Sequence, residues 1–316
     1  MPNRFLRSNQ QIVKETITTD DLRAGGYLAP EQASKFLQQT FEATVLGGLV
    51  RHEKRRAKTG EVDKIGIGTR LLRAKVENVD DGYRAKPTED KLTYATVAVR
   101  LPWEITEETL RENIEGENYE KIVTDLMTQQ VGIDLEDLYL NGDEDALSTV
   151  DDYDFIKLND GWVKQLMNGS HIEDRSSKSG GAMSLDVFYD AIREIPNKFN
   201  NGTLRWLMSP HRKQEWEKYI LNQAVTVGGI ITDKRVEAPA GIPVVEVPAM
   251  PDDKIILTNP KNLITINTYD MKIRKTTEGK AAIMQDKRFY VIHLDFDCII
   301  EEMDAALIVK GLAALS

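Results

Sequence analysis

The chain has 316 residues, of which 41% are hydrophobic and 29% are charged, and its net charge is −10. This composition is typical of a folded globular protein and excludes a disordered or fibrous chain. The single cysteine, Cys298, excludes a disulfide framework and any metal site built from several thiolates. Residues 1–15 lack the apolar core of a secretion signal, and no stretch approaches the roughly 18 apolar residues of a membrane helix. We therefore expect a soluble protein made in a cytoplasm.

Charge is distributed unevenly along the chain. Residues 1–100 carry 18 Lys and Arg against 13 Asp and Glu, residues 101–160 carry 3 against 18, and residues 161–316 carry 20 against 20. A basic region followed by a strongly acidic one suggests that the first region of one subunit contacts the second region of a neighbour. An acidic helix face exposed to water is the simpler alternative.

The first hundred residues predict an arm, a short helix and a ribbon. After Pro30, the side chains of Phe36, Leu37 and Phe41 fall on one side of a predicted helix. Residues 61–74 and 92–103 are predicted strands, and the stretch between them is charged and rich in turn residues. A two-stranded ribbon of this length has too little core of its own, so it needs a surface to lie on.

A long helix follows, because apolar residues from Tyr119 to Leu138 recur at steps of three and four. Two further helices are predicted, one capped by Ser184 and one beginning at Ser209-Pro210, where a cap residue precedes proline. The remaining segments alternate between strand and turn. Strands and helices do not alternate regularly, which favours an α+β fold over a doubly wound sheet.

The sequence contains no recognisable catalytic or metal-binding pattern. The four histidines are far apart, and Cys298 alternates with Phe296 as a core residue of a strand does. Asp143-Glu144-Asp145 resembles the start of a calcium loop, but Ser148 stands where that loop needs glycine. A basic cluster at residues 51–56 lacks interleaved aromatic residues, which favours a solvated or subunit-facing patch over a nucleic-acid site. We expect neither enzymatic activity nor a cofactor.

Seven short segments then occur in a characteristic order. They are Gly25-Gly-Tyr-Leu-Ala-Pro30, Tyr83-Arg-Ala-Lys-Pro87, Ile105-Thr-Glu-Glu-Thr-Leu110, Tyr139-Leu-Asn-Gly-Asp143, Trp206-Leu-Met-Ser-Pro210, Gly241-Ile-Pro-Val-Val245 and Ala306-Leu-Ile-Val-Lys-Gly311. In this order they resemble the major capsid proteins of tailed bacteriophages, the Hong Kong 97 type. The resemblance covers nearly the whole chain.

The resemblance implies an architecture with five parts. These are an N-terminal arm and short helix (1–44), an extended loop and its base (45–103), a peripheral domain with a long spine helix (104–182), an axial domain (183–283), and C-terminal strands that return to the peripheral domain (284–316). Only about 25 residues precede the Gly-Gly turn, so no cleaved scaffolding segment is expected and a separate scaffolding protein is implied.

The implied function is self-assembly as hexamers and pentamers into an icosahedral head around packaged double-stranded DNA. The implied partners are other copies of the chain, a scaffolding protein, a portal protein and optional decoration proteins, without a membrane. Two alternatives remain open: an encapsulin-type compartment that holds a cargo protein, and a soluble enzyme whose site forms only in three dimensions.

The expected inter-subunit contacts are charged residues of the arm, the loop and the long acidic helix. They are Arg4, Arg7, Arg70, Arg73, Lys75, Arg84, Lys86, Glu120, Asp134, Glu136 and Asp137.

Overall fold

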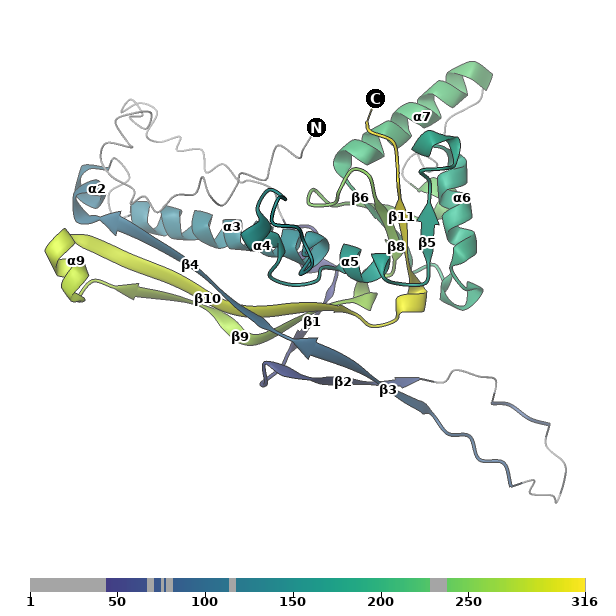
Figure 1. Ribbon diagram of the computed structural model, residues 1–316, viewed down its shortest axis with the longest axis horizontal. Coiled ribbons are helices and arrows are strands. Elements are labelled where there is room, and N and C mark those ends of the chain that lie inside the picture. The colour runs from purple at the N-terminus through teal and green to yellow at the C-terminus, as the bar shows by residue number, and fades with distance from the viewer. Residues whose placement is uncertain are drawn as a thin grey trace.

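The structure is a computed structural model that describes residues 44–66, 71–74, 77, 82–113, 118–227 and 238–315 (Figure 1). The helices in these residues are α2 (Glu107–Glu112), α3 (Asn118–Asn141), α4 (Tyr153–Ile156), α5 (Trp162–Met167), α6 (Leu185–Glu194), α7 (Pro210–Val227) and α9 (Lys280–Gln285). The strands are β1 (Arg51–Lys54), β2 (Thr59–Gly66), β3 (Thr88–Ala95), β4 (Val97–Thr106), β5 (Ile172–Asp174), β6 (Arg205–Met208), β7 (Val244–Glu246), β8 (Ile255–Thr258), β9 (Leu263–Thr276), β10 (Lys287–Ile300) and β11 (Ala306–Lys310). The predicted α+β class is confirmed, whereas the predicted arm and its helix at residues 1–43 lie outside the described residues.

The first sheet has four strands in the order β1-β9-β10-β4, and α3 lies along one of its faces (Figure 1). β10 pairs antiparallel with β4 and β9, and β1 pairs parallel with β9. Alternate residues of β10 are buried, because successive strand side chains point to opposite faces and one face meets the helix. The core between them contains Trp103, Ile105, Tyr119, Val123, Val131, Leu138, Tyr290, Ile292, Leu294 and Phe296.

The second sheet has five strands in the order β5-β11-β8-β6-β7 and is covered on both faces. All four residues of β8 are buried, as expected for such a strand. On one face, the Phe188 ring of α6 meets the rings of Trp206 and Trp216 edge-on, with centroids 5.0 and 4.8 Å apart. On the other face, Trp162 of α5 donates its indole N–H to the carbonyl of Ile299 in β10 at 3.2 Å. Helix α5 therefore contacts both sheets.

The start of α7 follows the predicted Ser209-Pro210 step. The Ser209 hydroxyl accepts the backbone N–H of Arg212 at 3.2 Å. The Arg212 side chain is fully buried and donates to the carbonyl oxygens of Asp252 and Ala313, the latter at 2.8 Å. These bonds hold the C-terminal segment against the first turn of α7.

Strand pairing crosses two of the predicted domain boundaries, and the five-part division itself stays a prediction. β9 lies in the first sheet, although the predicted axial domain (183–283) includes it. β11 lies in the second sheet beside β5, although the prediction returns 284–316 to the peripheral domain and places β5 there. The reason is long-range pairing: β10 ends at Ile300, and a short 3-10 turn, Met303–Ala305, carries the chain across to the other sheet. Local β-propensity does not specify which sheet a strand joins.

Candidate interaction surfaces

A two-stranded ribbon leaves the first sheet and extends away from both sheets (Figure 1). β2 and β3 pair antiparallel from Thr59 opposite Ala95 to Gly66 opposite Thr88. At about 3.3 Å per residue the paired part is roughly 25 Å long. The predicted strand at 61–74 ends at Gly66, and the predicted strand at 92–103 is divided at Thr96 into β3 and β4. One almost continuous strand therefore begins in the ribbon and ends in the first sheet.

A small apolar cluster attaches the ribbon to the first sheet. Val62 and Tyr94 are buried against isoleucine side chains of β9 and β10. Gly60 lies against Tyr94, and a Cβ at this position would be only 2.7 Å from the tyrosine hydroxyl oxygen. Further out the side chains are exposed, and Ile65 is 73% exposed. The ribbon buries too little apolar surface to be stable without support.

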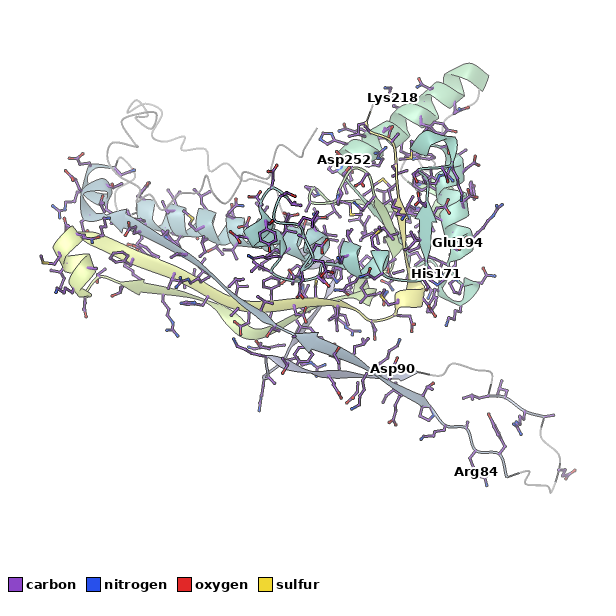
Figure 2. All side chains as sticks on the ribbon, viewed as in Figure 1. Arg84, Asp90, His171, Glu194, Lys218 and Asp252 are labelled. Carbon is purple, nitrogen blue, oxygen red and sulfur yellow. The ribbon has the colours of Figure 1, made fainter. Side chains whose placement is uncertain are left out.

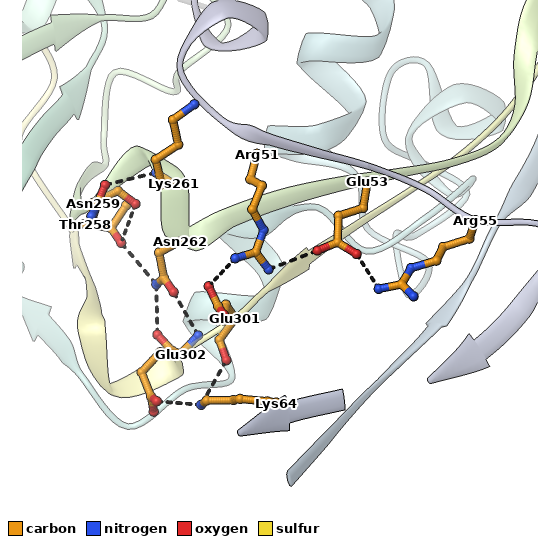
Figure 3. A network of polar contacts seen from close by, with 10 residues as sticks. All are labelled: Arg51, Glu53, Arg55, Lys64, Thr258, Asn259, Lys261, Asn262, Glu301 and Glu302. Carbon is orange, nitrogen blue, oxygen red and sulfur yellow. Dashed lines mark hydrogen bonds and ion pairs between the residues drawn. The ribbon is translucent and has the colours of Figure 1, made fainter. Parts of the chain in front are cut away.

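A polar network forms a second attachment, further along the ribbon than the apolar cluster (Figure 3). Lys64 of β2 donates to the Glu302 carboxylate at 2.5 Å and to the Glu301 carbonyl oxygen at 3.2 Å. Arg51 of β1 binds the carboxylates of Glu301 at 2.8 Å and Glu53 at 3.2 Å. Single ion pairs this close to solvent contribute about 0–1 kcal/mol. These ion pairs therefore fix the position of the ribbon more than they add to the stability of the subunit.

Basic and apolar groups occupy the far end of the ribbon. The Arg73 guanidinium lies over the Tyr83 ring, with 3.7 Å between Cζ and the ring centroid. Arg84 donates to the Tyr83 carbonyl oxygen at 2.8 Å, and both Arg84 and Lys86 are exposed (Figure 2 labels Arg84). Leu72 is 99% exposed. Four other predicted contact residues lie outside the described residues: Arg4, Arg7, Arg70 and Lys75.

Glu120, near the start of α3, is bound within its own subunit. Its carboxylate accepts hydrogen bonds from Lys275 and Arg288, each at 2.6 Å. Burial raises the pKa of Glu120, but these two cationic donors outweigh burial, and the pKa is lowered overall. Arg288 also pairs with Glu107 of α2, and this hydrogen bond lowers the pKa of Glu107. The cluster attaches α2 and α3 to β9 and β10.

The acidic residues near the end of α3 do not form an exposed face. Glu136 and Asp137 are 6% and 8% exposed, and Glu136 accepts the backbone N–H of Leu46 at 2.9 Å. Burial raises the pKa of Asp137 to about 6, although the Asn141 amide donates to its carboxylate at 2.6 Å. Burial also raises the pKa of Asp134. The expected acidic face is thus corrected for Glu136 and Asp137, because tertiary packing turns both inward. That any of the four residues contacts a neighbour stays a prediction.

The connection after α3 is an acidic surface that sequence reasoning missed. Residues 143–154 carry six carboxylates, while Leu147 and Val150 are 72% and 43% exposed. Lys164 of α5 binds two of these carboxylates, Asp143 at 2.7 Å and Asp145 at 3.1 Å. The sequence signal is the excess of acids over residues 101–160, which sequence reasoning assigned to the long helix and not to this connection.

Comparison with known proteins identifies the fold. No family model matches the chain. The chain is 26% identical over 324 residues to the "Putative prophage capsid protein YqbE" of Bacillus subtilis (strain 168), covering 96% of this chain and 99% of that protein. It also matches a chain of the "Satellite phage P4 procapsid including size determination (Sid) protein" with a TM-score of 0.60 at 15% identity, covering 90% of this chain and 100% of that chain. The chain has the Hong Kong 97-type capsid fold.

The predicted resemblance to the phage capsid proteins is thereby confirmed. The capsid fold also occurs in a chain of the holo-SrpI encapsulin complex from Synechococcus elongatus PCC 7942. That match has a TM-score of 0.55 at 11% identity and covers 97% of this chain and 96% of the encapsulin chain. The capsid fold alone therefore does not separate a phage head from a protein compartment.

In this capsid-fold chain, the part that the structure describes contains no group of three or more side chains arranged to hold a metal ion. None of its described helices has the length and apolarity needed to cross a membrane. Cys298 is 1% exposed, and burial raises the pKa of its thiol, as expected for a core cysteine. A cleft of about 440 Å³ lies beside Gly142, and its two lysines, Lys164 and Lys254, pair with aspartates.

Proposed function

We propose that the protein is a major capsid protein that assembles as hexamers and pentamers into an icosahedral head enclosing packaged double-stranded DNA. The observation that carries the proposal is the ribbon. It leaves the subunit with little buried surface of its own and ends in exposed basic and apolar side chains. A neighbouring copy supplies the surface that the ribbon lacks. The phage capsid relative and the structural neighbours support the same function.

The contact that we propose joins the ribbon tip of one copy to an acidic surface of another. Arg73, Arg84 and Lys86 lie at the tip, and all three side chains are exposed. Residues 143–154 are the preferred acidic partner, because they combine six carboxylates with exposed Leu147 and Val150, whereas Glu136 and Asp137 are buried. Opposite charges of this kind steer association and fix register more than they add affinity.

The remaining partners follow from the proposed function. A separate scaffolding protein, a portal protein and optional decoration proteins would take part in assembly in the host cytoplasm, and the product would be the virion capsid. DNA would be enclosed without sequence-specific binding. The net charge of −10 fits a container for DNA, because a strongly basic lining would bind the phosphates of the genome. The protein would act as a structural component and not as an enzyme.

The test is the assembly state of the purified full chain. Size exclusion with light scattering, followed by negative-stain microscopy of the large fractions, should show capsomers or closed shells. Shells formed when the chain is co-expressed with the products of the neighbouring genes should contain nucleic acid. A co-purifying cargo protein in place of nucleic acid would favour the second candidate, an encapsulin-type compartment, which the SrpI match supports. If the chain stays a monomer or small oligomer both when purified alone and when co-expressed with the products of the neighbouring genes, the proposed function is contradicted.

A further inference from the structure

Two attachments at different distances along the ribbon hold it to the subunit. Near the base, the N–H of Ala95 donates to the Asp297 carboxylate of β10 at 2.8 Å, and Val62 and Tyr94 pack against isoleucine side chains of β9 and β10. Further out, Lys64 reaches Glu302. From Thr59 at the base to Lys64, the extended strand spans about 16 Å. Because the Lys64–Glu302 contact lies further from the base, it restricts the direction of the ribbon more than a contact at the base does.

The residue that Lys64 binds belongs to the connection between the two sheets. β10 ends at Ile300 in the first sheet, and β11 begins at Ala306 in the second. Asn262 fixes this connection by accepting the Glu302 N–H on its side-chain oxygen and donating its amide to the Glu302 carbonyl, both at 2.9 Å. Its own carbonyl accepts the Glu301 N–H at 3.0 Å. The partner of Lys64 thus has a firmly held backbone (Figure 3).

We infer that the Lys64–Glu302 ion pair is a latch that fixes the direction of the ribbon relative to the connection between the sheets. The two side chains are 22% and 32% exposed, so they are partly shielded from water. Lys64 also bonds the Glu301 carbonyl, which restricts it to one side of the connection. A change in the relative orientation of the two sheets therefore moves the ribbon with it. The latch is a property of the single subunit and does not depend on the proposed function.

The test measures a distance between the ribbon and the second sheet in the unassembled full chain. Spin labels are placed at Glu89→Cys on β3 and Glu194→Cys on α6, both exposed positions, and Cys298 is too buried to react. Lys64→Ala and Glu302→Gln should each raise the population outside the main distance peak about two- to fivefold, as expected for the loss of a partly exposed ion pair. Lys64→Glu combined with Glu302→Lys should restore most of the main peak.

The matched control is Lys91→Ala, which removes an ion pair with Glu61 inside the ribbon and changes the charge equally. It should leave the distance distribution unchanged. An unchanged distribution in both latch variants, or equal broadening in the control, would overturn the inference. Circular dichroism reports whether each variant folds. If Lys64→Ala does not fold, Glu302→Gln decides the question, because it keeps the backbone bonds to Asn262. Shell formation is not a readout, so a failed capsid function would leave the result valid.

Discussion

Arg212 and Asp137 are both buried ionisable residues, and they differ in the groups that bind their side chains. Arg212 is 0% exposed, donates to two backbone carbonyl groups and pairs with Glu215. Asp137 accepts its hydrogen bond from the neutral amide of Asn141, and the nearby carboxylates of Asp134 and Asp152 add to the effect of burial on its pKa. A buried carboxylate without a compensating cation is unfavourable when it is ionised. The ionised Asp137 carboxylate therefore lowers the free energy of unfolding at neutral pH.

We predict that Asp137→Asn stabilises the subunit at pH 7.5 and not at pH 4. The folded state holds the proton of Asp137 more tightly than the unfolded chain, so stability falls as the pH rises from about 4 to about 6 and stays reduced above that range. The folded pKa of about 6, set against about 3.9 in the unfolded chain, corresponds to roughly 2–3 kcal/mol at neutral pH.

Urea unfolding at the two pH values measures the effect of Asp137→Asn. The control, Asp125→Asn, changes the net charge equally on the exposed side of the same helix. Equal stability changes for Asp137→Asn at both pH values would show that the Asp137 carboxyl does not titrate as described.

At the scale of the element, the ribbon differs from the sheets in what holds it. Most strands of the two sheets contain buried side chains, whereas the ribbon exposes most residues of β3 and is attached through Tyr94 of β3, Val62 of β2 and the latch. Such an element is stable in its own subunit only near its base. Its outer part is available for contact with another molecule, which is why its charge is expected to matter for assembly more than for folding.

We predict that reversing the charge of the ribbon tip with Arg73→Glu, Arg84→Glu and Lys86→Glu together blocks shell formation and leaves the subunit folded. These side chains project away from the core, so the unfolding midpoint should change little. Light scattering and electron microscopy measure assembly, and circular dichroism measures folding. The matched control replaces Arg73 and Arg84 with lysine and Lys86 with arginine, which keeps the charge. Normal shells from the reversed variant would refute the proposed contact.

At the scale of the whole molecule, the two sheets and the helices packed on them form one body, and the ribbon extends outside it. α5 packs against β10 and β11, and the connection from β10 to β11 passes between the sheets. The subunit body therefore folds around contacts that do not involve the tip. The shell, in contrast, is proposed to need the tip in every copy.

We predict that residues 67–87 can be replaced by Asn-Gly without loss of the subunit fold. Gly66 and Thr88 face each other at the end of the ribbon, so a two-residue type I′ turn closes the hairpin with the correct twist. Thermal unfolding should stay within a few degrees of the original chain, which corresponds to less than about 1 kcal/mol. Assembly should be lost. Shells of normal size from this variant would show that the tip is not an assembly element.

The local part of this structure was accessible from the sequence. The three- and four-residue spacing of apolar side chains predicted α3, the Ser209-Pro210 step predicted the start of α7, and the alternation of Phe296 with Cys298 predicted a buried strand. These features depend on residues that are close together in the chain, because helix period, strand period and caps are local properties.

The sequence by itself determined the α+β class, the long helix, the ribbon and the segregation of charge. Only the tertiary structure decided that β9 joins the first sheet, that β11 crosses to the second, and that Glu136 and Asp137 point inward. It also brought Lys64 to Glu302, which lies 238 positions further along the chain. The physical reason is that strand pairing and burial depend on which distant segments meet, and neither local propensity nor local charge specifies that choice.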